Sequence, residues 1–152
     1  MKPRAQPGRP FDPLEAGPNE PLALLHFAFR AVVAEPDAQL AELGLGRVHH
    51  RVLFFIARVP ELRVVDLLAT LNVTKQALHQ PLAELVRQKL VNSRSEPSDR
   101  RERWLSLSAE GKALERRLSG HQRRAFAAAF RKAGPSATDG WRSVMRELIT
   151  RP

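Results

Sequence analysis

Residues 66–91, DLLATLNVTKQALHQPLAELVRQKLV, predict two helices joined by a tight turn. Asn72 stands where the chain must change direction, and asparagine tolerates the left-handed backbone conformation better than most residues other than glycine. Thr74 follows, and its hydroxyl can accept a hydrogen bond from a free backbone N–H at the start of a helix. Apolar residues then recur at helical spacing, at Leu78, Leu82, Leu85, Val86 and Leu90. The stretch is therefore typical of a helix-turn-helix.

The outward side of the second helix carries side chains that suit the major groove of DNA. A helix-turn-helix places its second helix in that groove, and base contacts come mainly from the N-terminal half of the helix. Glutamine can pair with adenine, lysine with guanine, and threonine can meet a phosphate or a thymine methyl group. The candidate DNA-binding residues here are Thr74, Lys75, Gln76, His79 and Gln80. The alternative is that they form the solvated face of an amphipathic helix.

A proline interrupts the same helix. Pro81 lies about two turns from the helix start, where proline removes a backbone hydrogen bond and crowds the preceding turn at roughly 3 kcal/mol. One hypothesis is that Pro81 kinks the helix, or sets a new first turn, so that residues 74–80 tilt into the groove. The alternative is that tertiary packing simply tolerates the proline.

A hairpin is predicted after the second helix. Strand-like residues flank Pro97 and Ser98, and alternation follows along Trp104 to Leu107. The hairpin bend carries three candidate DNA-binding arginines, Arg100, Arg101 and Arg103. Arginines beside a reading helix suit the minor groove, where the negative potential is focused. Asp99 is expected to orient one of them, and the alternative is a solvated charged turn.

The remaining sequence predicts further helices around this motif. Residues 1–21, rich in proline and glycine, predict a flexible N-terminal arm. Pro36 and Pro60 are expected to end the two helices before the motif, and Ser108 to cap the long helix after it. The predicted helices cover about residues 22–35, 46–58, 74–89, 109–132 and 138–150, with a further short helix in the stretch of residues 63–73. The expected fold class is mainly α with a small β-hairpin wing.

Two segments resemble the MarR family of bacterial winged-helix transcription regulators. Residues 66–91 are similar to the family's helix-turn-helix. Residues 99–114, DRRERWLSLSAEGKAL, are similar to its wing and the start of its long helix, with the D-R-R triplet and an L-[ST]-x-x-G signature. The chain departs from the family pattern at Ala77, His79, Pro81 and Lys89. The resemblance therefore does not carry over a preferred DNA sequence.

The resemblance implies one MarR-like domain over residues 22–152. Within it, residues 43–108 would form a winged helix-turn-helix, and residues 22–35 and 109–150 the dimerisation helices. It also implies a homodimer that binds a palindromic operator in double-stranded DNA, with repression as the expected outcome. Arg101, the second arginine of D-R-R, is the wing residue that the family pattern assigns to the minor groove.

Some members of the family bind small aromatic acids between the dimer helices and the DNA-binding lobe, and the ligand weakens DNA binding. The candidate ligand-binding residues are His49, His50 and Arg51, because imidazole or guanidinium can meet a carboxylate. The alternative is that one of the two histidines is exposed and the other half-packed. The protein would then bind DNA independently of a ligand.

Composition narrows the classes of function. Lys and Arg number 25 against 16 Asp and Glu, and the net charge of +9 favours a polyanionic partner. There is no cysteine, which excludes thiolate metal ligands and cysteine nucleophiles. No phosphate-binding loop, nucleophile elbow or pair of catalytic carboxylates is recognisable, so neither an enzyme nor a cofactor is expected. The five histidines have no metal-ligand spacing, so no metal site is expected either.

The apolar stretch at residues 22–34 is interrupted by His26 and Arg30 and is too short to span a bilayer. No membrane partner is therefore expected, and the expected location is cytoplasmic. The main competing function is a winged-helix module for protein–protein contact. The basic wing argues against it, because a protein-binding wing has no need of so much positive charge.

Overall fold

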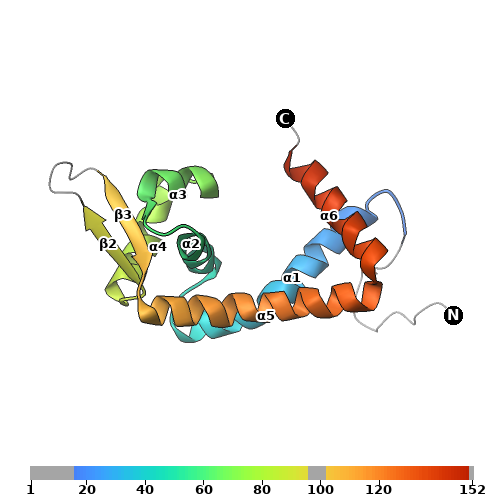
Figure 1. Cartoon of the computed structure of the whole chain (residues 1–152), viewed down its shortest axis with the longest axis horizontal. Coiled ribbons are helices and arrows are strands. Elements are labelled where there is room, and N and C mark those ends of the chain that lie inside the picture. Colours follow the sequence, from blue (N-terminus) through green and yellow to red (C-terminus); the bar gives the residue numbers. More distant parts are fainter. Residues whose placement is uncertain (1–15, 96–101, 151–152) are drawn as a thin grey trace.

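The computed structural model describes residues 16–95 and 102–150, which form a mostly helical fold with one small sheet (Figure 1). The helices are α1 (Glu20–Glu42), α2 (Arg47–Arg58), α3 (Val64–Leu71), α4 (Lys75–Arg87), α5 (Ala109–Ala133) and α6 (Pro135–Ile149). The strands are β1 (Leu62–Arg63), β2 (Val91–Ser95) and β3 (Arg103–Leu107). The prediction of a mainly α fold with a β-hairpin is confirmed.

The sheet is antiparallel, with the strand order β1-β3-β2. Leu105 lies opposite Leu62 of β1 and Ser93 of β2, and it is fully buried. β2 and β3 are the predicted hairpin, and its predicted turn at Pro97 and Ser98 lies outside the described residues. β1 was not predicted, because two residues are too short for an alternating pattern.

The apolar core lies where α2, α3 and α4 meet the sheet and the first half of α5. Leu53, Leu67, Leu85, Leu105 and Leu118 are fully buried in this cluster. Figure 1 shows that α5 runs from this lobe toward α6 and the N-terminal half of α1. One long helix thus connects the helix-turn-helix lobe with the other helical part of the molecule.

The first helix is longer than predicted. α1 continues through Pro36 to Glu42, so the expectation that Pro36 ends it is wrong. Val33, Pro36 and Leu40 are buried and follow one another at helical spacing. Pro36 belongs to the stripe that α1 buries, and apolar burial of about 1.5–3 kcal/mol per side chain offsets the loss of one backbone hydrogen bond.

The start of α5 follows the predicted signal. Ser108 caps the helix, since its hydroxyl accepts a hydrogen bond from the Gly111 N–H at 2.9 Å. Gly134, with a φ of 90°, separates α5 from α6. α6 begins at Pro135 rather than at residue 138, because proline suits the first position of a helix, where its missing N–H would have no partner. Of the helices in the described ranges, none has the length and apolar character needed to cross a bilayer.

Candidate DNA-binding surface

The turn between α3 and α4 has the predicted geometry. Asn72 adopts the left-handed conformation, with φ 51° and ψ 48°, and ends α3. The Val73 N–H donates to the Leu68 carbonyl at 3.2 Å, which closes the turn. Thr74 accepts a hydrogen bond from the Ala77 N–H at 3.1 Å and starts α4. Both residue-level predictions are confirmed, and together they fix the angle at which α4 leaves α3.

The two sides of α4 differ as the apolar pattern predicts. Leu78, Leu82 and Leu85 are buried against the core. The five candidate residues are exposed: Thr74, Lys75, Gln76, His79 and Gln80. The packing of α4 therefore leaves these side chains free to meet a partner, and their contact with DNA stays a prediction.

Pro81 lies inside α4 without interrupting it. The helix is continuous from Lys75 to Arg87, and its N-cap is Thr74. The hypothesis that Pro81 sets a new first turn is therefore wrong. Pro81 is half-buried and follows directly after the exposed residues 79 and 80. The hypothesis that it aims them stays a prediction.

Arg103 of β3 points toward α4. Its Nε and Nη2 donate to the Ser93 hydroxyl of β2, at 3.0 and 2.7 Å. The arginine lines a hollow of about 130 Å³ together with Lys75 and His79. Three of the predicted DNA-binding residues thus converge from the helix and the wing strand. The other three wing residues, Asp99, Arg100 and Arg101, lie outside the described residues.

The opposite face of the sheet holds arginines that the sequence reasoning missed. Arg63 and Arg94 lie on either side of Trp104, opposite it in register. Arg63 contacts both carboxylate oxygens of Asp66, at 2.7 and 3.0 Å, and Glu102 at 3.1 Å. These hydrogen bonds, first to Asp66 and then to Glu102, raise the pKa of Arg63. Arg63 therefore ties β1 to the start of α3 and to the base of the wing.

The two candidate ligand-binding histidines are both buried. His49 and His50 each expose only 7% of their surface, so the alternative of one exposed and one half-packed histidine is wrong. His49 Nε2 lies 2.6 Å from a carboxylate oxygen of Glu84 on α4. His50 Nε2 lies 3.3 Å from the Ser119 hydroxyl on α5, and burial lowers the pKa of His50. Arg51 is exposed.

Arg58 joins α2 to α5, and nothing in the sequence indicated this role. Its Nη1 donates to the Phe54 carbonyl at 2.7 Å and to Glu115 at 2.9 Å. The guanidinium carbon lies 3.3 Å from the centre of the Phe54 ring. Burial alone would raise the pKa of Glu115, but hydrogen bonds from Ser119 and Arg58 outweigh it and lower that pKa. Glu115 is therefore ionised at neutral pH, and the pair is a charged link between the two helices.

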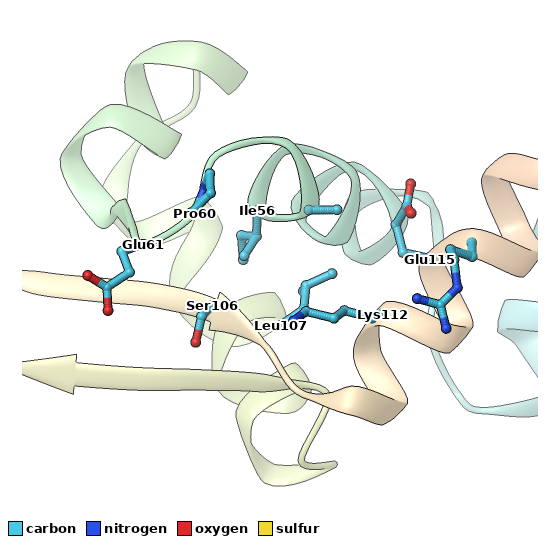
Figure 2. A pocket seen from close by; sticks show the side chains of 9 residues that line it. Ile56, Pro60, Glu61, Ser106, Leu107, Lys112 and Glu115 are labelled. Atoms are coloured by element: carbon cyan, nitrogen blue, oxygen red, sulfur yellow. The ribbon is translucent and has the colours of Figure 1, made fainter.

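Two hollows lie beside this link. The first, of about 360 Å³, is lined by Phe54, Arg58, Ser119, Gln122, Arg123, Phe126, Ala127 and Phe130. The second, of about 410 Å³, is lined by Ile56, Ala57, Pro60, Glu61, Ser106, Leu107, Lys112, Glu115 and Arg116. Figure 2 shows the second hollow, where side chains of α2, β3 and α5 converge. Both volumes fall within the range of small-molecule sites. Within residues 16–95 and 102–150, no three His, Cys, Asp or Glu side chains cluster closely enough to hold a metal ion.

Comparisons with known proteins agree with this geometry. A sequence model of the MarR family matches residues 43–102. The HTH-type transcriptional regulator PetP of Rhodobacter capsulatus is 44% identical over 125 residues, which are 82% of this chain and 75% of PetP. FabT of Streptococcus pneumoniae, solved in complex with DNA, superposes with a TM-score of 0.70 at 17% identity and covers 86% of this chain and 96% of its own. NadR, solved in complex with 4-hydroxyphenylacetate, gives 0.68 at 20% identity and covers 95% of this chain and 100% of its own.

Proposed function

The chain belongs to the MarR family of DNA-binding transcriptional regulators, and we propose that it works as a homodimeric repressor of a palindromic operator. It is a regulator and not an enzyme. Each protomer places α4 in the major groove of one half-site and its wing in the neighbouring minor groove. The repressor acts in the cytoplasm, where its operator lies.

The observation that carries this proposal is the exposed cluster on α4 beside Arg103. Lys75 and His79 line one hollow with Arg103, and Gln76 and Gln80 are exposed on the same helix. Glutamine, lysine and arginine supply the hydrogen bonds that distinguish bases in the major groove. A helix with only a structural role does not require these hydrogen-bonding side chains together on its exposed side.

The dimer is supported by apolar surface on α1 and α6. Leu22, Phe29, Leu148 and Ile149 are 68%, 51%, 52% and 80% exposed, respectively. A monomer rarely leaves so many large apolar side chains in water. A second protomer that packs α1 and α6 against those of the first would bury them. Two copies of α4 would then face two half-sites.

The hollow beside Arg58 supports release by a small aromatic acid. Its walls are mainly apolar and aromatic, and Arg58 and Arg123 provide positive charge for a carboxylate. NadR, whose fold this chain shares, was solved with 4-hydroxyphenylacetate. A bound carboxylate would compete with Glu115 for Arg58 and would disturb the link between α2 and α5. His49, His50 and Arg51 do not line this hollow, and of the three His50 contacts one of its lining residues, Ser119.

Binding titrations on random and selected duplexes, at several salt concentrations, test the proposal. We expect a selected duplex to bind more tightly than random DNA, and log affinity to fall with log salt by about 0.9 per phosphate contacted. Arg101→Ala should weaken binding and reduce that slope by about one. Arg124→Ala on α5 removes the same charge outside the proposed surface and should leave the slope unchanged.

Light scattering at micromolar concentration should give the mass of two chains. A monomer would contradict the dimer. Equal affinity for selected and random duplexes would contradict sequence-specific recognition. Weak binding to every duplex would instead favour the alternative of a winged-helix module for protein–protein contact.

A further inference from the structure

A chain of hydrogen bonds runs from the start of α2 to the exposed side of α4. The Gly46 N–H donates to His49 Nδ1 at 3.0 Å. His49 Nε2 lies 2.6 Å from Glu84 Oε2. The other oxygen, Glu84 Oε1, accepts from Gln80 Nε2 at 3.1 Å. A buried residue of α2 is thus connected to a candidate base-reading residue of α4.

The hydrogen bond from the Gly46 N–H determines which atoms donate and which accept along this series of hydrogen bonds. A backbone N–H can only donate, so His49 Nδ1 carries a lone pair. A carboxylate can only accept, so His49 Nε2 carries the hydrogen. His49 is therefore the neutral Nε2–H tautomer. Hydrogen bonds from His49 and then Gln80 lower the pKa of Glu84, so its carboxylate is ionised at neutral pH.

The ionised carboxylate determines which way the Gln80 amide faces. Only the Nε2 side of the amide can donate to Glu84, so the oxygen of Gln80 must face away from it. The amide then presents to solvent one acceptor, Oε1, and one remaining N–H donor. Adenine presents the complementary pair in the major groove, an N7 acceptor and an N6 donor. Guanine presents two acceptors, O6 and N7, and would meet the Gln80 oxygen with one of them.

We propose that Glu84 is a positioning residue for DNA recognition, which holds the Gln80 amide in the orientation that reads adenine and rejects guanine. His49 fixes Glu84 from the core of α2 and so couples the orientation of this reading group to the packing of the lobe. The inference rests on the proposed function, because it assigns a base preference to one residue of the proposed reading helix.

The substitution Glu84→Gln should reverse the orientation of the Gln80 amide, while a side chain of the same length remains at position 84. The oxygen of the new side chain can still accept from His49, and its NH₂ group then faces Gln80. Gln80 can keep its hydrogen bond only by turning its own oxygen inward and both N–H groups outward. Two outward donors match the O6 and N7 acceptors of guanine. We expect the adenine-to-guanine affinity ratio to fall by about tenfold, or to invert, at one base pair of each half-site.

The experiment first selects duplexes from a random pool with the wild-type protein. The base pair that Gln80 contacts is identified as the position of the duplex at which the base preference disappears in the Gln80→Ala variant. Titrations on adenine and guanine versions of that duplex then compare the wild type, Glu84→Gln, Gln80→Ala and the double variant. Glu42→Gln, an exposed carboxylate at the end of α1, matches the charge change and should leave the ratio unaltered.

Two results would overturn the inference while leaving the proposed function intact. One is an unchanged adenine-to-guanine ratio in a Glu84→Gln variant whose thermal melt shows that it is folded. The other is a shift that persists in the Gln80→Ala background, since a group acting through Gln80 must lose its effect there. If Glu84→Gln does not fold, Glu84→Asp enters the same cycle, and its shorter side chain should also lower the ratio. If the wild type selects no duplex at all, the proposed function itself fails.

Discussion

At Gly111 the backbone of α5 lies so close to that of Leu90 that no side chain fits between them. A Cβ atom on Gly111 would lie 1.9 Å from the Leu90 carbonyl oxygen. The same oxygen accepts from the N–H and the hydroxyl of Ser108, at 3.1 and 3.2 Å. This single carbonyl therefore holds the start of α5 against the end of the helix-turn-helix, and glycine is what permits the contact.

We expect Gly111→Ala to destabilise the protein by about 2–3 kcal/mol, because backbone on both sides must move to admit the methyl group. Urea denaturation measures the change. Gly120→Ala in the same helix is the matched control, since its Cβ would meet only the ends of the Arg124 and Arg123 side chains, at 3.3 and 3.8 Å. Alanine favours helix there by about 1 kcal/mol, so the control should be neutral or stabilising. Equal losses in both variants would contradict this account.

Residues whose role depends on near neighbours could be predicted from the sequence, while those with distant partners could not. Asn72, Thr74 and Ser108 end or cap their helices through atoms no more than five residues away, so their type and position predicted these roles. The contact of Ser108 with Leu90, 18 residues away, was not predicted. His49 and Glu84 are 35 residues apart, and Arg58 and Glu115 are 57 apart. Nothing in either local pattern indicates such a partner, so the polar links across the core appear only in the structure.

Among the elements, prolines predicted where helices end less reliably than the capping residues Thr74 and Ser108 predicted where helices start. The rule that proline stops a helix predicted the end of α1 at Pro36, and the helix continues to Glu42. The same rule agrees with α2, which ends at Arg58, two residues before Pro60. The difference is burial: Pro36 lies within the packed stripe of α1, whereas Pro60 is exposed. Tertiary packing can offset about 3 kcal/mol of local cost, and the sequence alone does not show where it does.

The substitution Pro81→Ala tests whether the interior proline of α4 contributes to DNA recognition. Alanine restores an N–H at that position and favours helix by up to about 3 kcal/mol, partly offset because proline also restricts the unfolded chain. We expect Pro81→Ala to melt no lower than the wild type and to bind a selected duplex less tightly, because the residues before it would point along a straighter axis. Binding to random DNA, which depends on phosphate contacts, should barely change. An unchanged ratio of selected to random affinity would mean that the proline is only tolerated.

On the scale of the whole molecule, α5 is an element through which the two ends of the protein can influence each other. Its first half packs with the helix-turn-helix lobe through Leu114 and Leu118. Its second half packs with α6 through a cluster of three rings, Phe126, Phe130 and Trp141, whose centres lie 5.2–5.6 Å apart. The hollow beside Arg58 lies between these two contacts and shares two of the rings. A ligand that fills it touches both α2, through Phe54 and Arg58, and two rings of the cluster that packs against α6.

Release by a ligand therefore has a definite expected outcome. Salicylate or 4-hydroxyphenylacetate at millimolar concentration should weaken binding to a selected duplex by at least about fivefold, the lower end of typical coupling between two sites. Arg123→Gln removes an exposed cation from the wall of the hollow and should reduce that effect, while DNA affinity without ligand stays within about twofold of the wild type. Arg124→Gln, the adjacent exposed arginine outside the lining, should respond to ligand as the wild type does. By reciprocity, the selected duplex should weaken binding of the acid by the same factor, which calorimetry can measure. If neither acid changes the DNA affinity of the wild type, the protein binds its operator independently of such ligands, and the hollow is only a gap between α2 and α5.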